Sequence, residues 1–234
     1  MFVITFLLFV SFTWYPPIQK ISVSMVAKSL HNGKSVTANG EVFFQTNGGL
    51  MVTHFTSPFD QVVITNSKGE YKNYDIKNNT LAQSQGLDYS SKNSFFYCFL
   101  SGKIQDMGLL SFGYTLKNTR MEDKMVITTW LPPVNTDIPL SKVEIVHENF
   151  LPVFMGFFDK TGKPVNKVYY SNYQNTQNIQ LPMNITEFQY LSDGDSVISK
   201  RIYSNIKINE QVDNTYLHYK IPSNARLVKP GEIK

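Results

Sequence analysis

Residues 40–74, GEVFFQTNGGLMVTHFTSPFDQVVITNSKGEYKNY, read as short strands separated by turns. Runs rich in Val, Ile, Phe, Tyr and Thr are interrupted by Asn47-Gly48-Gly49, by Ser57-Pro58 and by Asn66-Ser67-Lys68-Gly69. Short runs of this kind between Gly, Pro and Asn are typical of an antiparallel meander. None of them carries a nucleophile, a paired acid or a metal-binding cluster. We therefore predict four strands that present apolar surface, at residues 42–44, 50–55, 61–65 and 71–76.

The same pattern continues along most of the chain. Asp159-Lys160-Thr161-Gly162 and Asp193-Gly194-Asp195 each separate two strand-like runs, which predicts two hairpins. Strands and long helices do not alternate, so a parallel α/β fold is excluded. Further strand-like runs lie at residues 80–85, 125–131, 143–148, 153–158, 165–171, 185–190, 197–203 and 216–221, and residues 225–228 follow Pro222 near the end of the chain. From these runs we predict about ten strands in the sheet.

Two regions have helix-like spacing of apolar residues. Residues 18–30 repeat apolar side chains every three to four positions, and Asn32-Gly33 would end a helix there. Residues 95–116 hold Phe95, Phe96 and Phe99 at similar spacing and predict one or two short helices. These are too short to form a domain, so we expect them to cover an open face of the sheet.

The N-terminus resembles an export signal. Residues 2–10 form an apolar run of the length of a signal-peptide core, too short to span a bilayer. No Lys or Arg precedes the run, and Ser22-Val23-Ser24 is a weak cleavage site. A buried N-terminal strand or helix is the alternative. We predict a signal peptide at residues 1–24, one domain at residues 25–234, and export as a soluble protein.

Composition narrows the function classes. The chain has 234 residues, 42% of them hydrophobic, with 17 Phe and 13 Tyr, which is enough apolar material for a large β domain. The net charge is +4 and the basic residues are scattered, so we predict no nucleic-acid partner. The single cysteine, Cys98, cannot form an internal disulfide and lies among aromatic residues, which indicates a buried thiol.

Catalytic and metal-binding motifs are absent from the sequence. The four histidines, His31, His54, His147 and His218, lack ligand spacing, and Asp193-Gly194-Asp195 is better explained as a turn. Glu41 and Asp60 have no second feature that would make them an acid–base pair. We predict no catalytic residue, metal or cofactor, and a protein that is not an enzyme. A site assembled from distant single residues is the alternative.

The order of these segments resembles one known family. A signal-like start is followed by G-E-V-F-F from Gly40 and by S-P-F-D-Q-V-V-I-T-N-S-K-G-E-Y-K-N-Y-D from Ser57. Residues 125–133 end in L-P-P, Phe157–Gly162 form a hairpin turn, and residues 216–228 hold Tyr219 and Pro222. This pattern is similar to LolA, the periplasmic carrier of bacterial outer-membrane lipoproteins. The match is one of pattern and order and covers most of residues 40–228.

The resemblance implies a mainly β fold, an open, unclosed antiparallel β-barrel of about ten to eleven strands with short helices forming a lid over an apolar cavity. It implies a periplasmic chaperone that shelters the acyl chains of lipoproteins. Its partners would be acylated lipoproteins, an inner-membrane lipoprotein-releasing transporter and an outer-membrane receptor, and we expect a monomer. Where the family has an Arg before a Pro that helps to hold the lid shut, this chain has Gln45-Thr46-Asn47-Gly48.

Alternation along the strands indicates candidate lipid-binding side chains. Successive strand residues point to opposite faces, so every second residue shares a face. One such face would line the cavity, whereas an ordinary core is the alternative. A general lipid or hydrophobic-ligand binder of the cell envelope and a purely structural β domain stay open as functions. The candidate lipid-binding residues are Val42, Phe44, Leu50, Val52, Val62, Ile64, Trp130 and Phe154.

Overall fold

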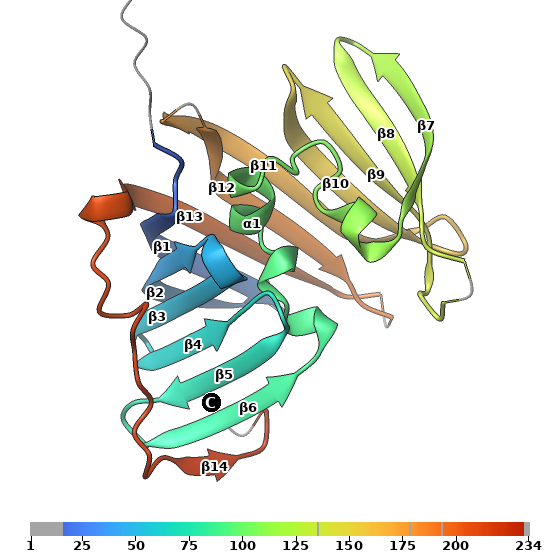
Figure 1. Ribbon diagram of the computed structural model, residues 1–234. Coiled ribbons are helices and arrows are strands. Elements are labelled where there is room, and N and C mark those ends of the chain that lie inside the picture. The colour runs from blue at the N-terminus through green and yellow to red at the C-terminus, as the bar shows by residue number, and fades with distance from the viewer. Residues whose placement is uncertain (1–15, 135, 178, 193, 232–234) are drawn as a thin grey trace, which may run out of the picture.

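A computed structural model describes residues 16–231 of the chain, except residues 135, 178 and 193. Fourteen strands within this part form one curved, open sheet, in the order β14-β6-β5-β4-β3-β2-β1-β13-β12-β11-β10-β9-β8-β7 (Figure 1). The strands are β1 (Lys20–His31), β2 (Lys34–Gln45), β3 (Leu50–Ser57), β4 (Gln61–Thr65), β5 (Glu70–Asp75), β6 (Thr80–Gln85), β7 (Thr115–Glu122), β8 (Met125–Leu131), β9 (Leu140–Glu148), β10 (Leu151–Asp159), β11 (Pro164–Thr176), β12 (Ile179–Tyr190), β13 (Ser196–Ile208) and β14 (Arg226–Val228).

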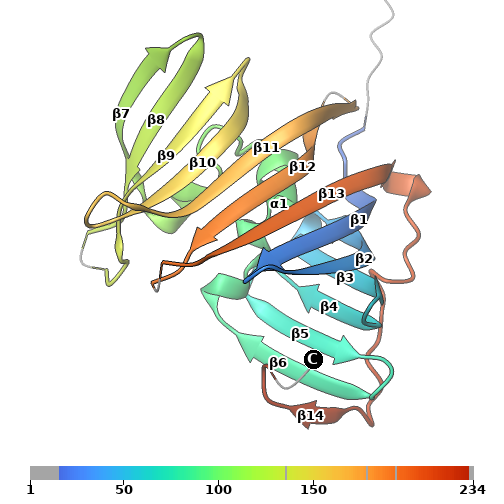
Figure 2. The same ribbon diagram turned by 180° about the vertical axis from the view of Figure 1, so that it is seen from behind.

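The sheet is built from two meanders. β1 to β6 form one and β7 to β13 form the other, and β1 joins them by pairing with β13 as well as with β2. All neighbours are antiparallel except β14, which pairs in parallel with β6. The sheet ends at β7 and β14 and does not close, as Figure 2 shows from behind. The predicted open antiparallel sheet is therefore confirmed, although the predicted ten to eleven strands were too few.

The predicted helix at residues 18–30 is wrong, because this segment is the central strand β1. Ile21, Val23 and Met25 alternate with less apolar residues, and this period of two competes with the helical spacing. Asn32 (φ 50°) and Gly33 (φ 70°) form the two-residue turn of a hairpin with β2. Asn-Gly suits such a turn because both central residues need positive φ.

Most of the other predicted strands are confirmed within a few residues. β4, β6 and β8 have the predicted bounds, and both predicted hairpins, β10–β11 and β12–β13, are formed. The predicted strand at residues 216–221 is wrong, since this segment forms turns. Leu116 belongs to β7, which the sequence did not predict, and not to a helix.

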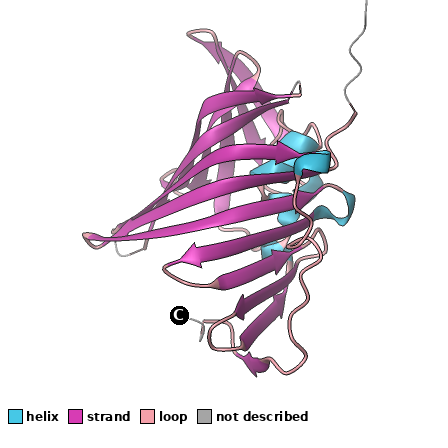
Figure 3. Cartoon of the chain, turned by 90° about the vertical axis from the view of Figure 1, so that its left-hand side faces the viewer, coloured by secondary structure: helices cyan, strands magenta, loops and turns pink. Residues whose placement is uncertain are grey.

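The chain crosses the sheet between β6 and β7, which lie near opposite ends of it. Residues 87–114, called the lid segment here, make this connection on one face of the sheet, the inner face (Figure 3). Ser94 caps the α-helix by accepting a hydrogen bond from the Tyr97 amide. The segment holds the helix α1 (Phe95–Leu100) and the short 3₁₀ helices η2 (Leu87–Tyr89), η3 (Ser91–Asn93) and η4 (Leu109–Phe112).

Part of the opposite, outer face, at β2 to β6, is covered by the C-terminal segment, residues 209–228. After β13 it passes η5 (Asn209–Gln211) and reaches β14 beside β6 (Figures 1 and 2). Its Val212 and Leu217 pack against Phe43, Val52 and Val62 of β2, β3 and β4. A further 3₁₀ turn, η1 (Asn47–Gly49), connects β2 and β3.

The N-terminal prediction lies mostly outside the described residues. The apolar run at residues 2–10 belongs to the part that the structure does not describe, and Ser24 lies within β1. The signal peptide at residues 1–24 and its cleavage point stay predictions. Among the described residues, no helix has the length and apolar character needed to cross a membrane.

Candidate functional site

A cavity of about 930 Å³ lies between the inner face of the sheet and the lid segment. This volume is at the upper end of the range of about 300–1,000 Å³ that is usual for ligand pockets. The sheet contributes every second residue of several strands, because alternate side chains share a face. Met25 and Ala27 of β1, Val42 of β2, Met155 of β10 and Tyr203 of β13 line the wall.

The lid segment supplies the facing wall through aromatic side chains. Phe95 lies 5.1 Å from the Tyr203 ring, and Phe96 stacks on Phe44 at 6.3 Å. Phe99 lies 6.2 Å from the Tyr173 ring. Each of these non-covalent contacts joins a ring of the lid segment to a ring of the sheet. The lid segment and an apolar ligand would therefore use the same surface of the sheet.

Hydrogen bonds fasten the lid segment at two places. At its start, the buried Ser91 hydroxyl donates to the Gly49 carbonyl in η1. Further along, Nε2 of the buried His147 on β9 lies 2.8 Å from the Ile104 carbonyl oxygen. Gly49 directly follows Gln45–Gly48, the stretch at which the resemblance to LolA would place a basic residue, so the Ser91 hydrogen bond lies beside that stretch.

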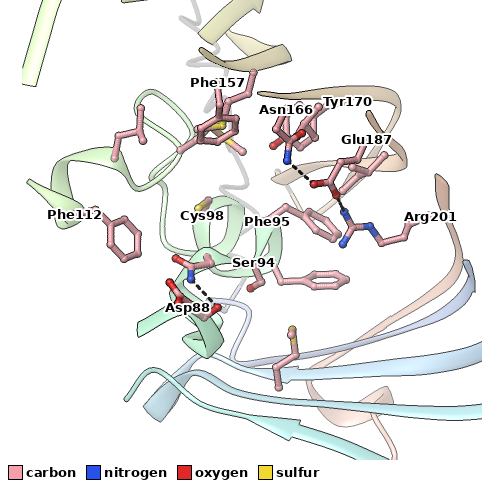
Figure 4. Close-up of a pocket in the computed structure, with 18 of the residues that line it drawn as sticks. Asp88, Ser94, Phe95, Cys98, Phe112, Phe157, Asn166, Tyr170, Glu187 and Arg201 are labelled. Carbon is pink, nitrogen blue, oxygen red and sulfur yellow. Dashed lines mark hydrogen bonds and ion pairs between the residues drawn. The ribbon is translucent and has the colours of Figure 1, made fainter. Parts of the chain in front are cut away.

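One part of the cavity wall is polar. The Asn166 amide donates to Glu187 Oε1 at 2.7 Å, and Arg201 Nη2 lies 2.9 Å from Glu187 Oε2 (Figure 4). The three residues lie on the neighbouring strands β11, β12 and β13 and all line the cavity. We call them the polar row. The rest of the wall is mainly apolar, with a few polar residues such as Asp88 and Thr53.

Burial keeps the Cys98 thiol and several tyrosine hydroxyls beside the lid neutral. Burial raises the pKa of the Cys98 thiol to about 12, and the charge of Asp106 adds to the effect. Burial also raises the pKa of Tyr203 to about 12, and it raises the pKa values of Tyr170 and Tyr173. The expected buried thiol is confirmed. A thiol with such a pKa is a poor nucleophile near neutral pH.

The described residues contain no group of three or more His, Cys, Asp or Glu side chains that could hold a metal ion. His54 approaches Asp60 at 3.1 Å, and the Tyr216 ring stacks on the His54 ring at 4.4 Å. This cluster lies with the C-terminal segment and does not line the cavity. The cavity can therefore be described by its shape, its apolar wall and the polar row.

Three of the eight predicted lipid-binding residues lie on the inner face. Val42 lines the cavity. Phe44 and Trp130 belong to the same buried core, where Phe44 lies under Phe96, and the Trp130 indole donates to Thr128 Oγ1 at 3.0 Å. Both side chains are packed in the core beside the cavity and do not line it.

The other five predicted residues lie on the outer face. Pairing places Phe43 opposite Val52, and Val52 opposite Ile64, so these side chains share the face that the C-terminal segment covers. The side chains concerned are Leu50, Val52, Val62 and Ile64. Phe154 of β10 stacks with Tyr169 at 5.1 Å, whereas its neighbours Met155 and Phe157 line the cavity.

The structure corrects which face of β3 reaches the cavity. The lining residues are Met51, Thr53 and Phe55, whose alternation includes a polar threonine. The predicted pair, Leu50 and Val52, belongs to the closed packing of the outer face. Pairing of Val42 with Thr53 sets this register, and strand alternation alone does not reveal it.

Other lining residues were missed for identifiable reasons. Met25 and Ala27 were hidden by the helix prediction for β1. Asn166, Glu187 and Arg201 are far apart in the sequence and meet only because β11, β12 and β13 are adjacent. The predicted short helix did contain lining residues, namely Phe95, Phe96 and Cys98.

Solved structures share this architecture. A DUF1329 family protein from Desulfovibrio piger superposes with a TM-score of 0.62 at 14% identity, covering 86% of this chain and 90% of that one. A LolA superfamily protein from Nitrosomonas europaea gives a TM-score of 0.57 at 14% identity, covering 86% and 90%. The chain has a LolA-like fold.

A third solved structure agrees with this result. An outer membrane lipoprotein-sorting protein domain from Vibrio parahaemolyticus gives a TM-score of 0.59 at 11% identity, covering 84% of this chain and 88% of that one. No protein-family model matches the sequence. No curated protein matches it either. The LolA-like resemblance inferred from the sequence is thus confirmed at the level of the fold.

Proposed function

We propose that this LolA-like chain binds acyl chains in the cavity on its inner face and carries acylated lipoproteins through the periplasm. The observation that carries the proposal is the cavity of about 930 Å³, which is walled by apolar side chains of the sheet and of the lid segment. Handing cargo from an inner-membrane transporter to an outer-membrane receptor requires binding without chemistry, and a catalytic role is not part of the proposal.

The size of the hydrophobic effect fits such a role. Each buried methylene stabilises a complex by about 0.8 kcal/mol, so about 14 methylenes would contribute on the order of 10 kcal/mol before ordering costs. A carrier must also release its cargo. Displacing Phe95 and Phe96 of the lid segment from Tyr203 and Phe44 would offset part of the gain, because the lid contacts are lost when the ligand enters.

Binding of free lipid is the second candidate function. It is favoured by the way the lid is fastened, through Ser91 and His147 and not through the basic residue of lipoprotein carriers. The two functions share the cavity and differ in cargo. A free-lipid binder would hold small acyl lipids and would fail to extract an acylated protein from a membrane.

Two neighbouring residues of β1 allow a matched test. Ala27 lines the cavity, whereas the adjacent Val26 points to the opposite face of the sheet. Ala27→Trp should weaken binding of a fluorescent acyl probe by at least about tenfold, because the indole takes up space that the chain needs. Val26→Trp should leave the affinity within about twofold.

Native mass spectrometry then identifies the cargo. Acyl species should accompany the wild-type protein and be lost from the Ala27→Trp variant. Release of an acylated lipoprotein from vesicles into a soluble complex would support the carrier function. Free lipid without such release would support the second candidate. A wild-type protein that binds no acyl probe would contradict both.

A further inference from the structure

The polar row is unusual because it interrupts an otherwise mainly apolar wall. Asn166, Glu187 and Arg201 run diagonally across three adjacent strands, each side chain reaching the next. Diagonal neighbours on a sheet are close enough for long side chains to meet. The charges of Glu187 and Arg201 cancel, and Glu187 uses one oxygen for each partner. The row therefore presents no net charge to the cavity.

Two atoms of the row have no hydrogen-bond partner among the described residues. They are the acceptor Asn166 Oδ1 and the donor Arg201 Nε, and both are buried. The other buried, unpartnered side-chain atoms of the described part belong to Ser22, Thr65, Asn73 and Gln177, none of which lines the cavity. Buried polar atoms without partners cost free energy. A ligand that pairs both would recover it, once the two side chains turn these atoms toward the cavity.

We propose that the polar row is a head-group subsite that binds a neutral secondary amide attached to the acyl chain. This inference rests on the proposed function, because the chain must occupy the cavity. A secondary amide offers a carbonyl to Arg201 Nε–H and an N–H to Asn166 Oδ1. In a trans amide the two groups point to opposite sides, and the two atoms belong to residues of strands on either side of β12.

Other head groups fit less well. An ester has no donor for Asn166 Oδ1. A carboxylate also lacks the donor, and it would place a second negative charge near Glu187, whose partner Arg201 is already engaged. An N-acylated peptide N-terminus and a small N-acyl lipid share the amide, so both are ligands of the proposed class.

The test uses ligands that share one hexadecanoyl chain. Each would displace a fluorescent acyl probe from the wild-type protein: N-methylhexadecanamide, an N-hexadecanoyl peptide, methyl hexadecanoate and hexadecanoate. At least one amide should displace the probe at a concentration about tenfold lower than the ester, because only the amide donates a hydrogen bond to the buried Asn166 Oδ1. An amide preference limited to the peptide identifies protein cargo, and one limited to the small amide identifies free lipid.

Variants assign the preference to the row. Asn166→Leu removes the acceptor and leaves the ion pair between Glu187 and Arg201 in place. Arg201→Lys keeps a cation at this position but removes the Nε donor. Asn166→Leu should bind amide and ester alike, whereas Arg201→Lys should weaken both and keep the difference between them. Asn175→Leu, at an exposed position on the same strand as Asn166, should keep the wild-type preference and affinity. Equal displacement by all ligands, or tightest binding of hexadecanoate, would overturn the subsite but leave the cavity function standing. Failure of the probe to bind would overturn the proposed function itself.

Discussion

The two faces of the same sheet are covered in opposite ways. On the outer face, Val212 and Leu217 of the C-terminal segment close over Phe43, Val52 and Val62, each of which is at most 1% exposed. On the inner face, the lid segment buries side chains such as Phe96, Cys98 and Phe99 in the core that it shares with the sheet, but it leaves a cavity of about 930 Å³. Both covers are irregular segments that lie on a largely apolar surface.

Apolar strand surface alone therefore does not identify a binding face. Leu50 and Val52 on the outer face of β3 are apolar, yet the chain itself covers them. The inner face includes Thr53 and the polar row and holds the cavity. A closely packed cover contributes stability, whereas a loosely packed one can exchange with a ligand.

The largest expected effect is on the closed face. Phe43→Ala removes a ring that is 1% exposed and stacked on Tyr216 at 5.2 Å, and it should lower the free energy of unfolding by about 3–5 kcal/mol. The acyl affinity of the folded protein should not change. Urea unfolding and probe titration measure the two quantities.

The matched substitution on the lid should behave in the opposite way. Phe95 is only half-buried, so Phe95→Ala should cost less stability than Phe43→Ala but should change acyl affinity. Equal stability losses for the two variants, or a loss of acyl binding in folded Phe43→Ala, would remove the distinction between the faces.

A smaller effect is expected where the lid is fastened. Ser91→Ala leaves the buried Gly49 carbonyl without its partner, a loss of about 1–3 kcal/mol. If the lid opens locally, alkylation of Cys98 should become between about fivefold and about a hundredfold faster. Mass spectrometry follows the reaction. Ser111→Ala, at an exposed lid serine, should leave the rate unchanged, and an unchanged rate in Ser91→Ala would show that this bond does not hold the lid.

A further expected effect is a pH dependence of stability. The Cys98 pKa rises from its ordinary value of 9.0 to about 12 on folding. Above pH 9 the unfolded chain loses the thiol proton and the folded chain keeps it. The stability contributed by the neutral thiol is therefore complete below pH 9 and is lost as pH rises toward 12, by about 1.4 kcal/mol per pH unit.

Cys98→Ala isolates this contribution from those of the buried tyrosines. Urea unfolding should be measured between about pH 8 and about pH 10.5 for both proteins. The free energy of unfolding should fall less steeply with pH in the variant than in the wild-type protein. Identical slopes would mean that the thiol is not buried under the lid as described.

The sequence predicted the strands well where turns punctuate it. Ser57-Pro58 and Asn66–Gly69 limit β3, β4 and β5, and Asp159–Gly162 sets the β10–β11 hairpin. Local turn chemistry is sufficient for such elements because it depends on a few adjacent residues. The Asn32-Gly33 turn was present too, but a competing helical spacing in β1 led to its interpretation as the end of a helix.

Features that depend on pairing across the chain were harder to predict. The cavity-facing side of β3 depends on its register with β2, where Val42 meets Thr53. The position of the lid follows from β6 and β7 lying near opposite ends of the sheet, a consequence of β1 pairing with β13. The polar row needs three strands from the second meander to be adjacent. Alternation within one strand carries none of this information.

Photo-cross-linking with an acyl chain that carries a diazirine at its far end tests most directly whether the inner face is the one that binds. Peptide mapping should place the label on inner-face residues such as Met25, Val42, Met155 or Tyr203, or on the lid at Phe95 to Phe99. Excess unlabelled acyl ligand should prevent the labelling. Label on Val52, Val62 or Leu217 of the outer face, or labelling that competition does not reduce, would contradict the account.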